Sequence, residues 1–347
     1  MKKRKFLWAI LSYLIAVASI WMVIRQSKNF DIKELLANIR SMQKGWLLLS
    51  FFCMFGFIWF EGFAIVKIAE KLGEKPKVRF GTLYGAADVY FSAITPSASG
   101  GQPASAYFML KDGIKSAVVT IVLLLNLVIY NLALLSLGAI CFFVSGKMLG
   151  QVSIEFQILE VIGTLVLIGL SIVFVLAIYK EQILYRIGDG LISVLTHLKL
   201  MKNGEKRRKH LHHTIEEYKE CAAVLSGNKR LLLTAFLLNL MQRLSQLAVT
   251  FTVFMSCGKG PVLSAKAMMM QTFVAVGSNS VPIPGAMGVA DYMMLDGFKR
   301  LIGSADAVRM ELLCRGITFY GCVLTGGILT AAGYIRRKNK NVSRKQS

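Results

Sequence analysis

The amino-acid sequence predicts an all-α polytopic membrane protein with about six full spans and two broken or re-entrant helical elements, arranged as an inverted repeat. Its residues are 55% hydrophobic and only 17% charged, and the mean hydropathy is +0.56. The apolar residues gather in blocks of about 20, the length that crosses roughly 30 Å of hydrocarbon as a helix. Two further apolar blocks are interrupted by proline and glycine, which end helices.

The net charge is +22, from 41 Lys and Arg against 19 Asp and Glu. In a soluble protein this excess would favour a nucleic-acid partner. Here the basic residues lie between the apolar blocks and at the two ends, as they do in cytoplasmic loops of membrane proteins. We therefore expect no nucleic-acid partner. The six cysteines show no metal-ligand spacing and are expected to fill apolar space.

The first half of the chain, residues 1–150, contains three expected full spans. The first span follows a basic N-terminus, and we interpret it as a span because no globular ectodomain comes after it. A stretch within 25–45 has apolar residues on one helical face, which suits the membrane interface. The expected spans of this half are about 6–24, 46–68 and 116–144.

The second half, residues 151–335, contains three more expected spans, at about 158–179, 231–255 and 312–334. The polar segment 180–230 is basic enough to be cytoplasmic, and its histidines are expected to be solvated. A basic tail, 336–347, follows the last span. This arrangement places both termini in the cytoplasm.

Residues 78–112 and 262–298 are the two broken elements. In each, proline and glycine divide an apolar segment into halves too short to span comfortably. Broken backbone at membrane depth is tolerated only where protein or water satisfies it. Each half of the chain thus has the order span, span, broken element, span. Three full spans per half invert the second half, an architecture typical of transporters.

The two breaks are candidate binding sites. A helix that begins inside the membrane presents free N–H groups and a positive dipole end, which bind anions such as phosphate. The competing interpretation is that the breaks only allow close helix packing. Two breaks at corresponding positions favour a central site. The candidate residues are Thr95, Pro96, Gly100, Gly101, Gln102, Pro103 and Tyr107 at the first break, and Pro282, Pro284, Gly285, Gly288 and Asp291 at the second.

A polar stripe marks the fifth expected span, because Asn239, Gln242, Arg243 and Gln246 recur at i, i+3, i+4 and i+7. We interpret this stripe as one wall of a hydrophilic groove in which Arg243 meets a phosphate. The alternative is that the stripe supplies hydrogen bonds between helices.

Placing an ionisable side chain at membrane depth costs free energy, so each such residue indicates a structural or functional role. Asp88 could bind a cationic group, carry a proton or cap the re-entrant helix. Glu311 and Arg315 form an i, i+4 pair, for which an internal ion pair or an interface anchor is the stronger interpretation. The secondary candidates are Glu61, Asn126, Tyr130, Glu311 and Arg315.

Several catalytic motifs are missing from the sequence. It contains no GxxxxGK[ST] and no HExxH, and its Cys and His residues lack metal-ligand spacing. We therefore expect no ATP hydrolysis, no cofactor, no bound metal and no catalytic residue.

Two segments resemble a known family. The runs ITPSASGGQPASAY, from Ile94 to Tyr107, and VPIPGAMGVAD, from Val281 to Asp291, are similar to the two signature segments of the lysylphosphatidylglycerol synthase transmembrane (flippase-like) family. That region is the amino-terminal membrane part of the bacterial multiple peptide resistance factor. The likeness covers most of the chain. Family members differ at the positions of Gln102 and Asp291, so the resemblance does not fix the lipid.

The resemblance implies movement of aminoacylated phosphatidylglycerol, or a related anionic lipid, between leaflets of a bacterial cytoplasmic membrane, with resistance to cationic peptides as the effect. In the family, lysyl transfer belongs to a separate soluble domain. We expect no transferase activity from this chain alone, although family members are often named phosphatidylglycerol lysyltransferase. The alternatives are a synthase subunit acting with a partner, an ion-coupled small-solute transporter and a DedA-like lipid transporter. The expected partners are phospholipids, and either a second copy of the chain or a separate synthase.

Overall fold

The computed structural model describes residues 42–180, 219–225, 227–279 and 281–346, together with isolated positions between 186 and 216. The described residues form helices joined by short turns, and no strand occurs among them. The all-α fold class predicted from the sequence is confirmed. The expected span at 6–24, nearly all of the stretch 25–45 and most of the segment 180–230 lie outside the described residues.

Five helical segments of the described part are long and apolar enough to cross a membrane, and they overlap the second to sixth expected spans. At 1.5 Å rise per residue, each is longer than the roughly 30 Å of hydrocarbon. The five segments are Lys44–Lys71, Ser116–Gln151, Ile154–Ile178, Lys229–Ser256 and Asp306–Arg337.

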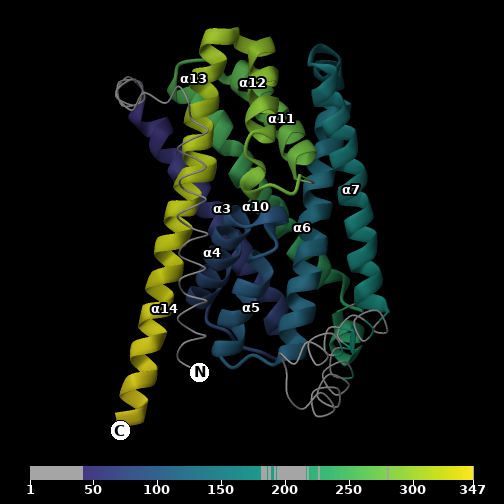
Figure 1. Cartoon of the computed structure of the whole chain (residues 1–347), viewed down its shortest axis with the longest axis vertical. Coiled ribbons are helices and arrows are strands. Elements are labelled where there is room, and N and C mark those ends of the chain that lie inside the picture. Colours follow the sequence, from purple (N-terminus) through teal and green to yellow (C-terminus); the bar gives the residue numbers. More distant parts are fainter. Residues whose placement is uncertain are drawn as a thin grey trace.

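Helices α3 (Lys44–Lys71) and α10 (Lys229–Ser256) lie against each other at the centre of the bundle (Figure 1). Their packing is close because small side chains lie between them: a Cβ on Gly56 would come 3.2 Å from the hydroxyl oxygen of Ser245. The pair forms the scaffold on which the two broken elements are placed.

Helix α4 (Val78–Ile94) crosses α3 through three glycines. A Cβ on Gly62 would lie 1.9 Å from the carbonyl oxygen of Gly81, and one on Gly85 would lie 2.5 Å from the carbonyl oxygen of Ile58. The two backbones are therefore in direct contact, the kind of crossing that small residues allow between membrane helices.

The first broken element is a helical hairpin. Helix α4 ends at Ile94, the short 3-10 turn η1 (Pro96–Ala98) follows, and α5 (Gly101–Lys111) packs back against α4. The hydroxyl of Thr95 fixes the bend, because it donates to the carbonyl of Phe91 at 2.6 Å and accepts from the amide of Gly100 at 2.8 Å.

The second broken element is also a hairpin, in which α11 (Pro261–Ser278) and α12 (Val289–Ile302) pack against each other across the turn η3 (Pro284–Ala286). The two hairpins occupy opposite ends of the bundle (Figure 1). Their turns meet between them, because η1 and η3 are in contact. Both breaks expected from the sequence therefore lie next to each other in space.

Each hairpin packs against a long helix from the other half of the chain. Helix α4 packs against α14 (Cys322–Gln346), and α11 packs against α6 (Ser116–Ser145) as well as against α7 (Ile154–Tyr179) of its own half. The inverted repeat expected from the sequence stays a prediction, because these contacts do not test symmetry between the two halves.

The last expected span is made of three consecutive helical pieces. Helix α13 (Ser304–Arg315) continues through a π-helical turn, η4 (Gly316–Gly321), into α14. A 3-10 turn, η2 (Gly146–Gln151), joins α6 to α7. π-helical turns inside a helix are frequent at functional sites. Here the turn directly follows Arg315, one of the candidate residues.

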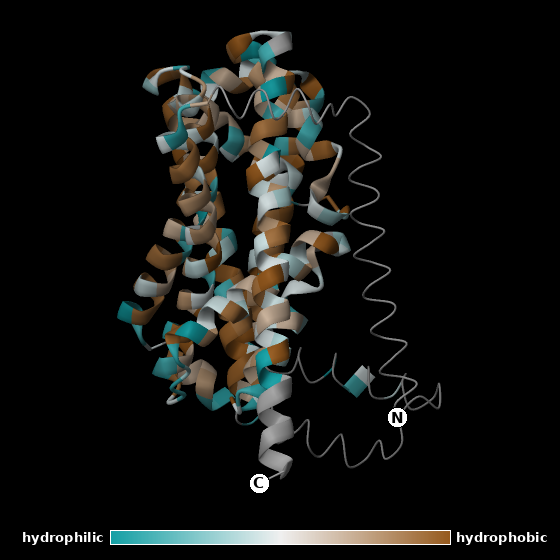
Figure 2. Cartoon of the chain, turned by 90° about the vertical axis from the view of Figure 1, so that its left-hand side faces the viewer, coloured by the Kyte–Doolittle hydropathy of each residue, from teal (hydrophilic) through white to brown (hydrophobic). Residues whose placement is uncertain are grey.

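Hydrophobic residues line most of the length of the bundle, and hydrophilic residues gather mainly toward its two ends (Figure 2). Helix α7 shows the lipid-facing pattern most clearly, since Ile154, Leu165 and Val173 are all more than half exposed. Such a continuous apolar surface belongs in hydrocarbon rather than in water. The fold is that of a multi-pass membrane protein.

Candidate functional site

A group of polar side chains is buried at the centre of the bundle, and we name it the central polar cluster. Charged and amide groups are expensive at membrane depth unless they contact one another or a ligand. These groups come from α3 and from three helices that contact it. The cluster consists of Glu61 on α3, Asp88 on α4, Asn126 and Tyr130 on α6, and Asn239, Gln242, Arg243 and Gln246 on α10.

Two carboxyl groups lie together in this cluster. Glu61 is 3% exposed and Asp88 is 7% exposed. Their carboxyl groups are within hydrogen-bonding reach of each other. The glycine crossing explains this approach, because Glu61 directly precedes Gly62 and Asp88 lies one helical turn after Gly85. Packing of α3 on α4 therefore sets the distance between the two acids.

A chain of amides connects Glu61 to the other helices. The side-chain amide of Asn126 donates to Glu61 Oε1 at 2.7 Å, and that of Asn239 donates to Asn126 Oδ1 at 3.0 Å. Gln242 lies within hydrogen-bonding reach of Glu61 as well. Hydrogen bonds thus join α3, α6 and α10, while the side-chain oxygens of Asn239 and Gln242 have no partner among the described residues.

Arg243 is the cation of the cluster, and its side chain is 4% exposed. Its guanidinium carbon lies 3.5 Å from the centre of the Tyr130 ring, and its Nη1 donates to Gln246 Oε1 at 2.9 Å. Its Nε and Nη2 groups have no hydrogen-bond partner among the described residues. A buried guanidinium with two free N–H groups can bind a planar or tetrahedral anion.

The first hairpin touches the cluster through its bend. The Gln102 amide donates to Asp88 Oδ2 at 3.1 Å, and Ser92 donates to Asp88 Oδ1 at 3.3 Å. Only glycine fits at position 101, because a Cβ there would lie 2.0 Å from Asp88 Oδ1. The carboxyl of Asp88 therefore rests against the start of α5.

Other candidates of the first break lie away from the cluster. Tyr107 is 44% exposed and stacks beside Lys111, 5.8 Å from ring centre to Nζ. Pro96 and Pro103 are exposed, and their effect is on the backbone, since Pro96 begins η1 and Pro103 lies in the first turn of α5. Thr95 and Gly100 shape the bend itself.

A second polar group lies at the second break. The ion pair expected between Glu311 and Arg315 is not what the structure shows: Arg315 Nε lies 2.5 Å from Asp291 Oδ1 instead. Its Nη2 also donates to the carbonyl of Gly285 at 3.2 Å. Asp291 Oδ2 accepts from the amide of Gly288 at 2.8 Å, and Glu311 is within hydrogen-bonding reach of Asp291. Spacing within one helix could not reveal this partner, which comes from α12.

Position 285 requires a glycine for two separate reasons. Its φ of +58° lies in the left-handed region, and a Cβ would come 2.0 Å from the ring of Phe319 in η4. Pro284 starts the η3 turn, while Pro282 lies exposed just before it. The second break is thus held by backbone shape together with the Arg315 ion pair.

A further ionic contact, which the sequence analysis missed, lies at the base of the first hairpin. Arg337 on α14 pairs with Asp112, and Tyr84 donates to Asp112 Oδ2 at 2.6 Å. The Arg337 guanidinium also lies 4.9 Å from the ring centre of Phe80 and 5.4 Å from that of Phe108. This contact fastens α14 to both arms of the hairpin.

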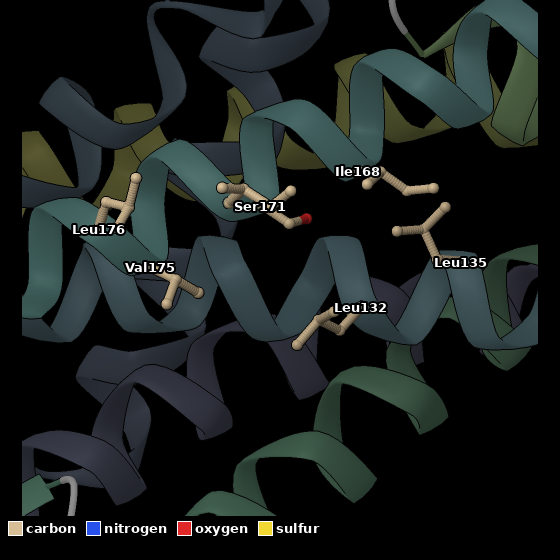
Figure 3. A pocket seen from close by; sticks show the side chains of 7 residues that line it. Leu132, Leu135, Ile168, Ser171, Val175 and Leu176 are labelled. Carbon is tan, nitrogen blue, oxygen red and sulfur yellow. The ribbon is translucent and has the colours of Figure 1, made fainter.

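A groove of about 270 Å³ lies between α6 and α7, and its lining is almost entirely apolar (Figure 3). The hydroxyl of Ser171 points to its own helix, donating to the carbonyl of Leu167 at 2.7 Å. The groove contains no charged group and shares no residue with the central polar cluster. It belongs to the hydrocarbon-facing surface. The lining residues are Leu132, Leu135, Ile168, Ser171, Ile172, Val175 and Leu176.

The glycine crossing of α3 and α4 is the main feature that the sequence analysis overlooked. Its signal was present as Gly81-x-x-x-Gly85, the small-residue spacing typical of close membrane-helix contacts. Within the described part of the chain, no three His, Cys, Asp or Glu side chains gather closely enough to hold a metal ion.

Comparison with known proteins identifies a family. The family model described as the lysylphosphatidylglycerol synthase TM region covers residues 9–326. No curated protein and no solved structure matches the chain.

Proposed function

Since the chain belongs to the lysylphosphatidylglycerol synthase TM region family, we propose that it moves an anionic phospholipid, aminoacylated phosphatidylglycerol or a related lipid, between the leaflets of a bacterial cytoplasmic membrane. The expected consequence is a less negative outer surface and resistance to cationic peptides. Both termini are proposed to be cytoplasmic, because the basic segments outside the spans are expected on that side.

The observation that carries the proposal is the unsatisfied guanidinium of Arg243. Within the part of the chain that the structure describes, its Nε and Nη2 groups are buried without a partner, which is costly unless a ligand binds them. A phosphodiester offers two acceptor oxygens that match the spacing of a guanidinium fork. Arg243 is therefore proposed to bind the headgroup phosphate, while the acyl chains stay in the surrounding hydrocarbon.

The two hairpin turns support the same location. Broken backbone inside a membrane is typical of substrate sites in transporters. Asp88, the acid of the central polar cluster that touches the first bend, is joined to Gln102 of α5. A shift of the first hairpin would therefore move the polar groups that surround a bound headgroup.

The test uses purified protein in liposomes that contain fluorescent phosphatidylglycerol in both leaflets. A membrane-impermeant reductant bleaches outer-leaflet lipid, so the rate of further bleaching reports movement from the inner leaflet. Arg243→Ala should slow this movement roughly 10- to 100-fold, as expected for loss of a charge-assisted hydrogen bond of about 1.5–3 kcal/mol. Arg243→Lys, which keeps the charge and loses the planar fork, should retain an intermediate rate.

The matched control is Arg230→Ala, since Arg230 lies on the same helix and is exposed at its start. Its lipid movement should equal that of the unmodified protein. Equal rates for Arg243→Ala and Arg230→Ala would show that the central arginine does not bind the transported headgroup.

The family description favours a second candidate, in which the chain assists synthesis of lysylphosphatidylglycerol together with a separate synthase. This candidate predicts new aminoacyl lipid when the purified chain, phosphatidylglycerol, charged tRNA and the synthase are combined, beyond what the synthase alone makes. An unchanged yield would leave lipid movement as the function.

A further inference from the structure

The two adjacent carboxyl groups of the central polar cluster must share a proton. A carboxylate accepts hydrogen bonds and has no hydrogen to donate. Glu61 and Asp88, which are within hydrogen-bonding reach of each other, therefore need one proton between them. The backbone contact of α3 and α4 keeps the two groups from separating.

Among the described residues, the neighbouring helices supply one cation to this pair. Arg243 on α10 is the positively charged side chain that acts on Glu61, and Tyr130 on α6 is the titratable group that faces both acids. Cys322 on α14 also acts electrostatically on Tyr130. Helix α5 contributes a neutral amide, the turns η1 and η3 contain no titratable residue, and η4 contains only Tyr320.

The charge balance of the site follows from these groups. With one shared proton, the carboxyl pair carries a single negative charge, which the guanidinium of Arg243 neutralises. An anion bound at Nε and Nη2 of Arg243 would add a second negative charge. An uncompensated charge at this depth is strongly unfavourable. Transfer of one proton from water to the remaining carboxylate oxygen makes both acids neutral and restores the balance.

We propose that Glu61 and Asp88 form a proton-binding site that takes up one proton when an anionic headgroup occupies Arg243, so that lipid and proton move together. The identity of the anion rests on the function proposed above. Because the anion-bound state holds more protons, anion affinity rises as the pH falls. The increase is at most about tenfold per pH unit for one proton, and the coupling is reciprocal.

The first measurement is calorimetric titration of the full chain in detergent with dihexanoyl phosphatidylglycerol as the probe. Titrations in two buffers of different ionisation enthalpy give the number of protons taken up per lipid bound. We expect uptake approaching one in the unmodified protein. The double variant Glu61→Gln/Asp88→Asn should bring uptake near zero, since neither amide can take a proton, whereas each single variant keeps one carboxylate that can still take one.

The control variant is Glu160→Gln. Glu160 is a half-buried acid on α7 whose carboxylate accepts from Thr164, and it lies outside the cluster. This variant should take up protons like the unmodified protein. Binding of the probe without proton uptake by the unmodified protein overturns the proposal, and this result does not depend on whether any variant folds.

A second measurement separates this proposal from the proposed function. Liposomes with a trapped pH-sensitive dye report proton movement while bleaching reports lipid movement. Lipid movement without proton movement, at a rate independent of pH, overturns the coupling and leaves the flippase intact. Proton uptake on binding without lipid movement overturns the flippase and leaves the proton site intact. Absence of any binding of the anionic probe overturns both.

Discussion

Gly62→Ala is the substitution for which the structure gives the sharpest expectation. Gly62 lies where α3 meets the backbone of α4, and its neighbour Glu61 carries one acid of the central polar cluster. The added methyl group would overlap the carbonyl of Gly81, an atom of the backbone that cannot rotate away. The substitution therefore tests whether the glycine crossing holds the two carboxyl groups together.

The size of the effect follows from the geometry. The new Cβ would lie 1.9 Å from the Gly81 oxygen, whereas ordinary contacts begin at 3.4 Å, so α3 and α4 must separate locally by about 1.5 Å. Overpacking of this kind costs about 1–3 kcal/mol, and a backbone obstacle favours the upper end. Alanine improves helix propensity by roughly 1 kcal/mol over glycine. The net loss of stability should be about 2 kcal/mol.

Gly169→Ala is the matched control, because Gly169 lies within α7 and a Cβ there meets no atom within 4 Å. That variant should gain about 1 kcal/mol from helix propensity alone. Thermal unfolding of the two purified variants in the same detergent measures the difference, expected near 3 kcal/mol in favour of Gly169→Ala. Equal unfolding temperatures would refute the packing argument. Gly62→Ala should also lose lipid movement at temperatures where it is still folded, since the acids are drawn apart.

Three further outcomes are expected from other contacts. Asp291→Asn should lower stability by about 1–3 kcal/mol, because it leaves the guanidinium of Arg315, 11% exposed, without its carboxylate. Unfolding of the Asp291 variant, an Arg315 variant and the double variant measures the coupling between the two residues. Gly285→Ala should unfold at a lower temperature than Gly303→Ala: both positions have positive φ, but only the first has an aromatic ring where the Cβ would lie. Arg337→Gln should speed hydrogen exchange in the adjoining turns of α14 and of the first hairpin. Global unfolding should change little, since the Arg337–Asp112 pair is partly exposed. Unchanged exchange would mean that this ion pair does not fasten α14.

Local periodicity made part of the site predictable. Residues spaced at i, i+3, i+4 and i+7 share one face of any helix, so Asn239, Gln242 and Arg243 were expected side by side, and the structure buries all three. The breaks were predictable for a similar reason, since proline and glycine interrupt a helix at their own positions in the sequence. Whether these residues bind a headgroup is still a prediction.

The partners of the charged residues were not predictable from the sequence. The contact of Glu61 with Asp88 depends on which face of α3 meets α4, and that choice is made by backbone packing between segments far apart in the chain. The same holds for Arg315. Its nearest acid along the helix is Glu311, but its ion pair is with Asp291 from a different helix. Hydropathy likewise shows that each break exists but contains no information on the contact between η1 and η3.

The exchange of packing partners between the two halves of the chain has a consequence for biogenesis. The first hairpin is synthesised early, yet its arm α4 packs against α14, which is made much later. This face of α4 therefore has no protein neighbour until the ribosome has synthesised α14. The broken backbone between α4 and α5 cannot satisfy its hydrogen bonds in lipid, so it must be sheltered in the meantime. The order of synthesis and the order of assembly therefore differ, and the packing around α4 is complete only when α14 has been inserted.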